Sequence, residues 1–178
     1  MVSPVGNTVA GSWANILAGK SGIGPIAAFD VSNFSTRIAG SVKNLNVTDY
    51  LPLKEVRKMD PFMQYGVVAG IQAFEDAGIT ITEANAERMG VVIGAGIGGL
   101  LGIEMGYGNY LQGGPKRISP FYIPSNIINL IAGHLSIRYG LKGPNYAIVT
   151  ACSTGTHCIG DAARMIERGD ADMMLAGG

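Results

Sequence analysis

The pattern of apolar and polar positions predicts its clearest helix over residues 61–77. Asp60 is a good N-cap, Pro61 fits the first helical position, and Gly78 is typical of a helix end. The apolar face of this helix consists of Met63, Val67, Ile71 and Phe74. We therefore expect the helix to bury one side against the core of the protein.

Three further stretches have helical spacing. One helix is predicted from an N-cap at Asn7 to about Leu17, and the others cover 124–138 and 158–168, with Gly169 ending the last. The apolar faces of the first two consist of Val9, Trp13, Ile16 and Leu17, and of Ile127, Ile128, Ile131 and Leu135.

Short apolar runs predict buried strands at 89–93, 146–149 and 172–178, and Ile38–Val42 is read as a short edge strand. We expect the strand at 146–149 to be buried on both faces of a sheet. Strands that alternate with helices in this way indicate an α/β fold. In such folds the functional loops follow the carboxyl ends of the strands.

Cys152 lies where the strand at 146–149 passes into the next helix. Unpaired N–H groups and the positive end of the helix dipole favour a thiolate over a thiol at that position. The same N–H groups can hold an oxyanion that develops on an acyl group bound at the sulfur. The alternative is that Cys152 is a small buried hydrophobic residue, the usual role of a lone cysteine, and position alone leaves both open.

The chain has two cysteines and two histidines. If Cys152 and Cys158 share a helix, their Cα atoms are about 9 Å apart, which is too far for a disulfide. A reducing, cytoplasmic setting is therefore the simpler interpretation. Neither His134 nor His157 is spaced with another ligand for a metal, and we expect no metal site. We favour structural or hydrogen-bonding roles for both histidines, and a dyad of His157 with Cys152 is the weaker alternative.

Residues 94–99 match the pattern G-x-G-x-x-G directly after a predicted strand. A dinucleotide site also needs a second strand that ends in an acidic residue about 20 positions further on, and this chain has Lys116 and Arg117 there. Close backbone packing therefore explains the glycines better. With Ile97 projecting from it, the stretch also suits the border of an acyl-sized apolar pocket.

Composition supports a globular protein, because 47% of the 178 residues are hydrophobic and 15% are charged. The 13 basic and 13 acidic residues create no overall field for nucleic acid or an anionic membrane. The first residues do not predict a signal peptide, and the uncharged stretch 119–137 contains prolines, asparagines and a histidine that argue against a membrane span. The one basic cluster, Lys54, Arg57 and Lys58, is on its own best read as a solvated helical turn.

Six stretches together carry a resemblance to a known family. They are Ser3-Pro4-Val5-Gly6-Asn7-Thr8, Arg57-Lys58-Met59-Asp60, Gly94-Ala95-Gly96-Ile97-Gly98-Gly99, Gly113-Gly114-Pro115-Lys116-Arg117-Ile118-Ser119-Pro120, Thr150-Ala151-Cys152-Ser153-Thr154-Gly155 and Gly169-Asp170-Ala171-Asp172. Over essentially its whole length, the chain closely resembles the β-ketoacyl-acyl-carrier-protein synthase II family, the elongating condensing enzymes of bacterial fatty-acid synthesis.

The resemblance implies a thiolase-like layered αβαβα fold made of two similar halves. Residues 1–178 would then be an N-terminal β-ketoacyl synthase domain that lacks its first strand and is incomplete at both ends. Cys152 matches the nucleophile that takes the acyl chain as a thioester, and its backbone N–H matches one oxyanion donor. The positions that match the acyl pocket are Gly96, Ile97, Ala151 and, across a homodimer interface, Tyr122.

The same resemblance changes the interpretation of the basic cluster. Lys54, Arg57 and Lys58 match the patch that receives the acidic acyl carrier protein, which suits three cations on one helical turn. No cofactor is expected, because phosphopantetheine arrives on the carrier protein. The implied substrates are acyl and malonyl thioesters, with no nucleic-acid or membrane partner.

The implied activity is that of a 3-oxoacyl-acyl-carrier-protein synthase: acyl transfer to Cys152, then decarboxylative Claisen condensation with malonyl carrier protein. In the family, two histidines of the second half drive decarboxylation, and neither His134 nor His157 matches them. We therefore expect that this chain by itself does not complete condensation. The alternatives are a polyketide ketosynthase, which shares the nucleophile motif, and a non-catalytic fragment that retains carrier docking or dimerisation.

Overall fold

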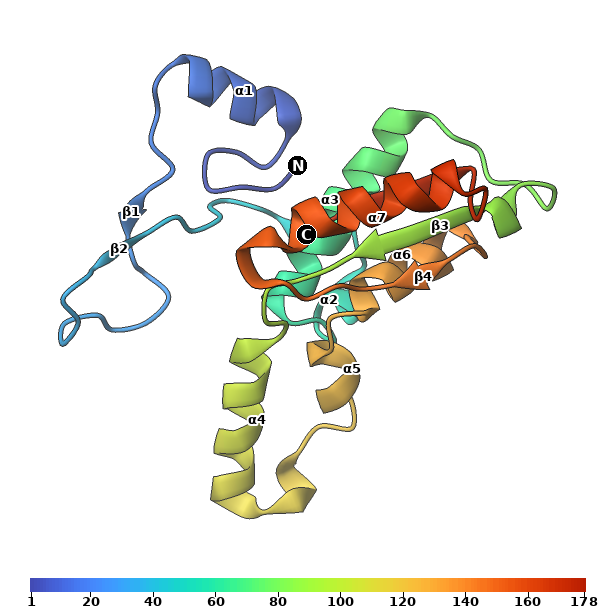
Figure 1. The fold of residues 1–178 in the computed structure, drawn as a ribbon. Coiled ribbons are helices and arrows are strands. Elements are labelled where there is room, and N and C mark those ends of the chain that lie inside the picture. Colours follow the sequence, from blue (N-terminus) through green and yellow to red (C-terminus); the bar gives the residue numbers. More distant parts are fainter. The chain divides into compact units, whose positions relative to one another are not determined.

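The computed structural model describes residues 1–178, which divide into two compact units, Met1–Asn46 and Val47–Gly178 (Figure 1). The first unit contains the helix α1 (Val9–Leu17) and a small antiparallel pair, β1 (Gly24–Pro25) and β2 (Ile38–Ala39). The second unit contains all the other helices and a three-stranded sheet.

The predicted first helix is confirmed, but its cap is different. Thr8 caps α1, and its Oγ1 accepts the N–H of Gly11 at 3.1 Å. Asn7, the cap predicted from the sequence, instead donates its side-chain N–H to the carbonyl of Lys43 at 2.7 Å. The predicted strand Ile38–Val42 is shortened to the two residues of β2, because only Gly24 and Pro25 lie opposite it.

The sheet of the second unit is parallel and has the order β4-β3-β5. The strands are β3 (Met89–Ile93), β4 (Asn145–Tyr146) and β5 (Met173–Gly177). Val91 and Val92 of the central strand are fully buried, and Val92 packs against Cys158 and Ala162. Because neighbouring side chains on a strand point to opposite faces, both faces of β3 are covered.

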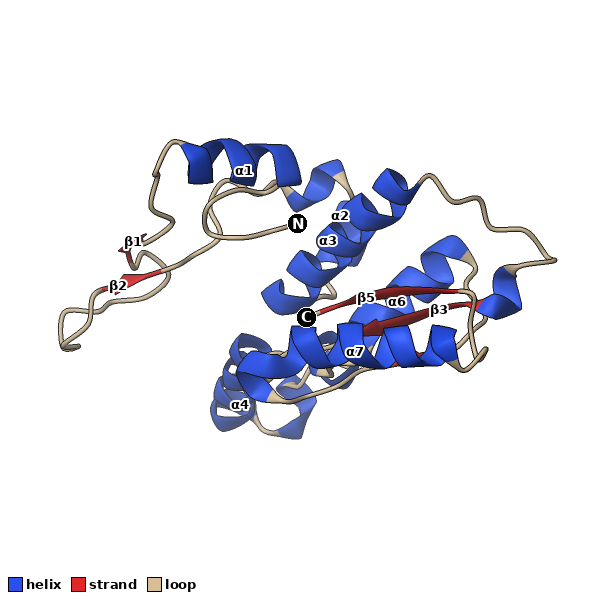
Figure 2. Cartoon of the chain, turned by 45° about the horizontal axis from the view of Figure 1, so that its top comes forward, coloured by secondary structure: helices blue, strands red, loops and turns tan.

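Helices provide that cover. The helix α7 (Thr154–Glu167) lies on one side of the sheet, and α6 (Leu130–Tyr139) lies on the other (Figure 2). The helix α3 (Pro61–Ala77) packs on α6, where Gly66 and Gly70 leave room for Ile131 and Leu135.

The boundaries predicted for α3 are confirmed. Asp60 accepts the N–H of Phe62 at 3.2 Å, and Gly78 ends the helix in the left-handed conformation with φ of 62°. The four residues of its predicted apolar face, Met63, Val67, Ile71 and Phe74, are all buried.

Three other predictions need correction. The helix predicted over 124–138 is two helices, α5 (Tyr122–Asn126) and α6, because Ile127 adopts an extended conformation with ψ of 139°. The strand predicted over 146–149 is the short β4, and Val149 is 50% exposed. The strand predicted over 172–178 is present as β5 but is only half-buried. Both strands lie at an edge of the sheet, where only one side has a neighbouring strand.

No helix was predicted over residues 100–113, whereas the helical turn predicted for the basic cluster is confirmed. The helix α4 (Leu100–Gly113) has no buried residue, and it lies beside α5 (Figure 1). The basic cluster belongs to α2 (Leu53–Val56), a helix of four residues, and to the residues that follow it. Single 3-10 turns occur at Val47–Asp49, Ala86–Arg88, Pro115–Arg117 and Ala151–Ser153.

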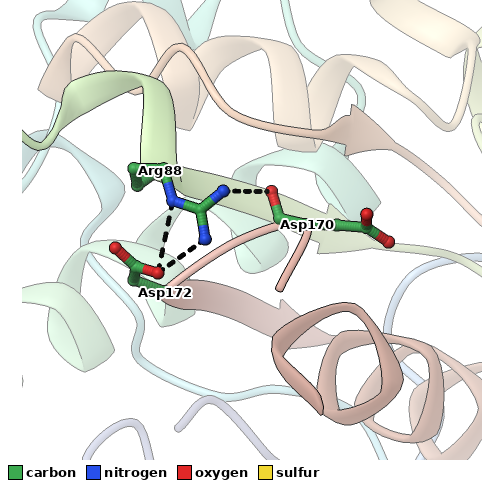
Figure 3. Close-up of polar contacts among 3 residues, drawn as sticks. All are labelled: Arg88, Asp170 and Asp172. Carbon is green, nitrogen blue, oxygen red and sulfur yellow. Dashed lines mark hydrogen bonds and ion pairs between the residues drawn. The ribbon is translucent and has the colours of Figure 1, made fainter. Parts of the chain in front are cut away.

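An ion pair joins the amino-terminal ends of two strands (Figure 3). Arg88, just before β3, donates to one carboxylate oxygen of Asp172 at 2.7 and 3.2 Å and to the carbonyl of Asp170 at 3.4 Å. The N–H of Asp172 returns a bond to the carbonyl of Arg88 at 2.8 Å. These contacts lower the pKa of Asp172 chiefly through the hydrogen bond from Arg88, and they hold β3 and β5 in register.

Candidate active site

The loops that follow the three strands meet at the carboxyl end of the sheet. The N–H of Gly94, after β3, donates to the carbonyl of Gly177 in β5 at 3.1 Å. A Cβ on Gly96 would lie 3.6 Å from the carbonyl oxygen of Ala151, which follows β4. The glycine stretch 94–99 and the turn that carries Cys152 are therefore neighbours, as expected for parallel strands.

Cys152 is exposed and sits in the 3-10 turn Ala151–Ser153, directly before the first residue of α7. The residue before it, Ala151, has φ of 50°, in the left-handed region that residues with a Cβ seldom occupy. Such a conformation persists only where its surroundings enforce it, and it is concentrated at functional sites.

Hydroxyl groups enforce this turn. Thr154 is buried, and its Oγ1 accepts the N–H of Thr150 at 3.0 Å and donates to the carbonyl of Ala151 at 2.8 Å. The hydroxyl of Ser153 donates to the carbonyl of Thr150 at 2.7 Å. Each bond closes a loop of three or four residues around Cys152, so the sulfur is presented at a fixed place.

The helix that follows has no side-chain cap. Ser153 at the N-cap makes no capping bond to the N–H groups of the first turn of α7, of which that of Thr154 donates to the carbonyl of Ala151. These groups and the helix dipole favour negative charge near Cys152. The turn therefore suits an oxyanion on an acyl group bound at the sulfur.

The second cysteine has the opposite environment. Cys158 is fully buried and packs against Val92 and Ala162, and burial raises the pKa of its thiol. Both cysteines are free, as predicted. The alternative left open by the sequence, that Cys152 is a small buried hydrophobic residue, is wrong, because Cys152 is exposed.

The two histidines have different surroundings. Nδ1 of His157 lies 3.4 Å from Oγ1 of Thr150, and its Nε2 lies 4.0 Å from a carboxylate oxygen of Asp161. His134 is on α6, where burial lowers the pKa of its imidazole. The predicted hydrogen-bonding role of His157 is confirmed.

The predicted acyl-pocket residues fall into two groups. Gly96 and Ala151 lie side by side next to Cys152, and Ile97 in the same loop is 71% exposed. Tyr122 lies on α5 against Gly106 of α4, and it lines a cavity of about 300 Å³. Neither Ile97 nor Cys152 lines that cavity, so within this chain Tyr122 is apart from the other pocket residues.

The basic cluster lies beside Tyr122. Lys54, Arg57 and Lys58 are all exposed, and Arg57 and Lys58 line the same 300 Å³ cavity as Tyr122. Nζ of Lys58 is 4.6 Å from the centroid of the Phe121 ring, a cation–π contact. The cations are therefore available to a partner and lie next to a pocket.

Asp60 has a second role that its cap motif did not reveal. Its carboxylate is 8% exposed and accepts the N–H of Phe62 in α3 at 3.2 Å and that of Gly102 in α4 at 2.8 Å. Its own N–H donates to the carbonyl of Ser125 in α5 at 3.2 Å. The carboxylate and the backbone N–H of Asp60 thus join three helices around the cavity, through contacts between residues far apart in the sequence.

No group of three or more His, Cys, Asp or Glu side chains is arranged to hold a metal ion. No helix is long and apolar enough to cross a bilayer.

Comparisons with known proteins show which family this chain is similar to. A family model described as "Beta-ketoacyl synthase, N-terminal domain" matches residues 1–178. The 3-oxoacyl-[acyl-carrier-protein] synthase 2 of Vibrio harveyi is 58% identical over 178 residues, which are 100% of this chain and 43% of that protein. The chain therefore spans less than half the length of this relative.

Solved structures show the same fold. A β-ketoacyl synthase from Burkholderia phymatum superposes with a TM-score of 0.81 at 27% identity, covering 99% of this chain and 44% of that one. A type II polyketide ketosynthase, solved in complex with its acyl-carrier protein and bound to the hexaketide, superposes with a TM-score of 0.76 at 22% identity, covering 98% of this chain and 46% of that one. The α/β, thiolase-like fold predicted from the sequence is thereby confirmed. The match over every residue places this chain in the β-ketoacyl synthase family, as its N-terminal domain.

Proposed function

We propose that this chain carries the nucleophile of a 3-oxoacyl-acyl-carrier-protein synthase of fatty-acid elongation. The observation that carries the proposal is the position of Cys152, exposed in a strained turn at the amino end of α7. The 58% identity to a synthase of that name supports elongation over polyketide synthesis.

The proposed step is a transfer of an acyl group between two sulfurs. The thiolate of Cys152 attacks the carbonyl carbon of the acyl-phosphopantetheine thioester, and a tetrahedral oxyanion forms. The backbone N–H of Cys152, beside the amino end of α7, holds this oxyanion. The carbon–sulfur bond to phosphopantetheine then breaks, the pantetheine thiolate takes a proton, and the acyl group remains on Cys152.

The second step, in which malonyl carrier protein loses carbon dioxide and its carbanion attacks the acyl-cysteine, needs a donor at the malonyl carbonyl. His157 is engaged with Thr150 and Asp161, and His134 lies on α6 beside Glu55. We therefore assign the acyl transfer to the residues of this chain and do not assign decarboxylation to either histidine.

Binding of the carrier protein is assigned to Lys54, Arg57 and Lys58. Their exposure and their position beside the Tyr122 cavity support an acidic partner that delivers a tethered acyl chain. We further propose a homodimer in which Tyr122 completes the acyl pocket of the second copy, because within one chain Tyr122 does not line a cavity with Cys152 or Ile97. Two free cysteines suit a reducing compartment such as the cytoplasm.

The test is intact mass spectrometry of the folded chain after incubation with a long-chain acyl carrier protein. The expected result is one acyl adduct that hydroxylamine removes, absent in Cys152→Ala and retained in Cys158→Ala. An adduct that persists in Cys152→Ala would contradict the assignment. A polyketide ketosynthase would instead prefer β-ketoacyl chains over saturated ones.

A further inference from the structure

A second cavity, of about 390 Å³, is lined by residues of α3 and α6 and by residues in and around α2. Three of its lining residues, Leu51, Met59 and Val67, are buried and apolar. Ile137 also lines the cavity, and 83% of its surface is exposed. The cavity therefore offers apolar surface that a partner can reach.

Charged side chains also line this cavity. Lys58 and Arg138 contribute positive charge and Glu55 contributes negative charge. His134 faces the same cavity, and its pKa is lowered by burial, an effect that the nearby Glu55 opposes. The imidazole is therefore largely neutral at neutral pH, and the cations exceed the anions.

The position of Arg138 is fixed by its neighbours. Its Nη2 donates to the carbonyl of Tyr50 at 3.3 Å, and its guanidinium carbon lies 5.9 Å from the ring centroid of Tyr139. Neither contact neutralises the charge. Arg138 is exposed, so it presents a positioned cation to solvent.

The cavity is continuous with the proposed docking cluster. Lys58 lines both this cavity and the one that contains Arg57 and Tyr122. A partner bound at Lys58 therefore touches the edge of both.

We infer that the docking surface of the carrier protein extends from α2 onto α6, with an apolar side chain of the carrier inserted beside Ile137 and a carboxylate of the carrier paired with Arg138. This inference rests on the proposed function. An apolar centre with cations at its rim is complementary to an acidic helix that exposes one apolar residue. Apolar anchors of this kind carry much of the binding energy of an interface, and rim charges set orientation and association rate.

The test is the dissociation constant of holo acyl carrier protein for the chain, measured by fluorescence anisotropy. We expect Arg138→Glu to weaken binding roughly tenfold at low salt, and the loss to shrink at high salt. Ile137→Ala is expected to weaken binding about fivefold at either salt concentration. Both side chains are exposed, so both variants are expected to keep the circular dichroism spectrum of the wild type.

The matched control is Lys142→Glu. Lys142 is also exposed, but it lies near the start of β3, where its backbone N–H donates to the carbonyl of Ala86. This charge reversal is expected to leave affinity within about twofold. An equal loss in Lys142→Glu and Arg138→Glu would overturn the inference, because it would show general attraction rather than a site.

The outcome also separates this inference from the function on which it rests. If Arg57→Glu weakens binding while Arg138→Glu and Ile137→Ala do not, the extension onto α6 is overturned and carrier docking at α2 stands. If none of these variants changes binding and no acyl adduct forms on Cys152, the proposed function fails. If Ile137→Ala changes the sedimentation of the chain but not its carrier affinity, the face belongs to a second copy and the inference is overturned.

Discussion

Arg88 and Asp172 form an ion pair at the amino end of the sheet, whereas Ala151, next to Cys152 at the carboxyl end, is held in a left-handed conformation that residues with a Cβ seldom adopt. At the first end, the charged groups are paired and the backbone is ordinary. At the second end, a residue with positive φ, a buried threonine and a glycine loop converge on one exposed sulfur. The amino end of the sheet is thus held by an ion pair, and the candidate active site lies at the carboxyl end.

Substitutions at the two ends of the sheet are therefore expected to differ in their cost to stability. Exposed charge pairs contribute little to stability, because water competes for both partners. Water cannot replace a close backbone contact or a buried hydroxyl hydrogen bond in the same way. We therefore expect larger losses of stability from changes at the carboxyl end of the sheet than from changes at its amino end.

The largest effect is expected for Gly94→Ala. A Cβ at this position would overlap the carbonyl oxygen of Ile148 and lie 2.5 Å from Cγ2 of Thr154. Relief requires movement of backbone, so we expect a loss of about 3 kcal/mol in the free energy of unfolding, measured by urea denaturation. Gly160→Ala in α7 is the control: it meets nothing within 4 Å and is expected to gain about 0.5–1 kcal/mol. Equal stability of the two variants would show that the strand and the turn do not approach closely.

A smaller loss is expected for Thr154→Val. This change removes both hydroxyl bonds and leaves the N–H of Thr150 without its acceptor. We expect a loss of about 2 kcal/mol together with slower acylation of Cys152, since the turn is no longer fixed. Thr156→Val, which alters an exposed hydroxyl of the same helix, is the control. Wild-type acylation by Thr154→Val would mean that these bonds do not position the sulfur.

Ala151→Gly is expected to act in the opposite direction. Glycine accepts φ of 50° without the steric cost of a Cβ, so the variant is expected to gain about 0.5–1 kcal/mol in thermal denaturation. A loss of stability would indicate that the methyl group of Ala151 makes a favourable contact instead of bearing strain.

The smallest effect is expected for Asp172→Asn. The pKa of Asp172 is lowered in the folded chain, so its carboxylate stabilises the fold at pH above the ordinary carboxyl range. That contribution is lost as the pH falls through the lowered pKa. The thermal midpoints of variant and wild type are therefore expected to differ slightly at neutral pH and to converge in acid. A difference that grows in acid would contradict this sign.

The sequence predicted those elements that are determined by residues close together in the chain. Asp60, Pro61 and Gly78 determine the ends of α3 by themselves, and the position of Cys152 before a helix followed from the change from apolar to hydroxyl residues. The resemblance to a family implied roles for Ala151, Tyr122 and Lys54 that composition and spacing do not supply.

Other features depend on contacts between distant residues, and the sequence did not show them. The sequence analysis identified no helix at α4, and all the apolar residues of this helix are at least partly exposed. The break at Ile127 and the edge positions of β4 and β5 are consequences of packing and strand order. The bond from Gly102 to Asp60 spans 42 residues. The hydroxyls of Ser153 and Thr154 were visible, but their bonds around a left-handed Ala151 were not.

The most direct test of the contrast between the two sulfurs is the rate of iodoacetamide alkylation in the two single-cysteine variants, Cys152→Ala and Cys158→Ala, of the folded chain. The exposed thiol at the amino end of α7 is expected to react at least about 100 times faster than the buried Cys158, which is accessible only when the chain opens. Urea should abolish this difference. Equal rates in the folded chain would contradict the claim that the turn at the carboxyl end of the sheet makes Cys152 the reactive thiol of this protein.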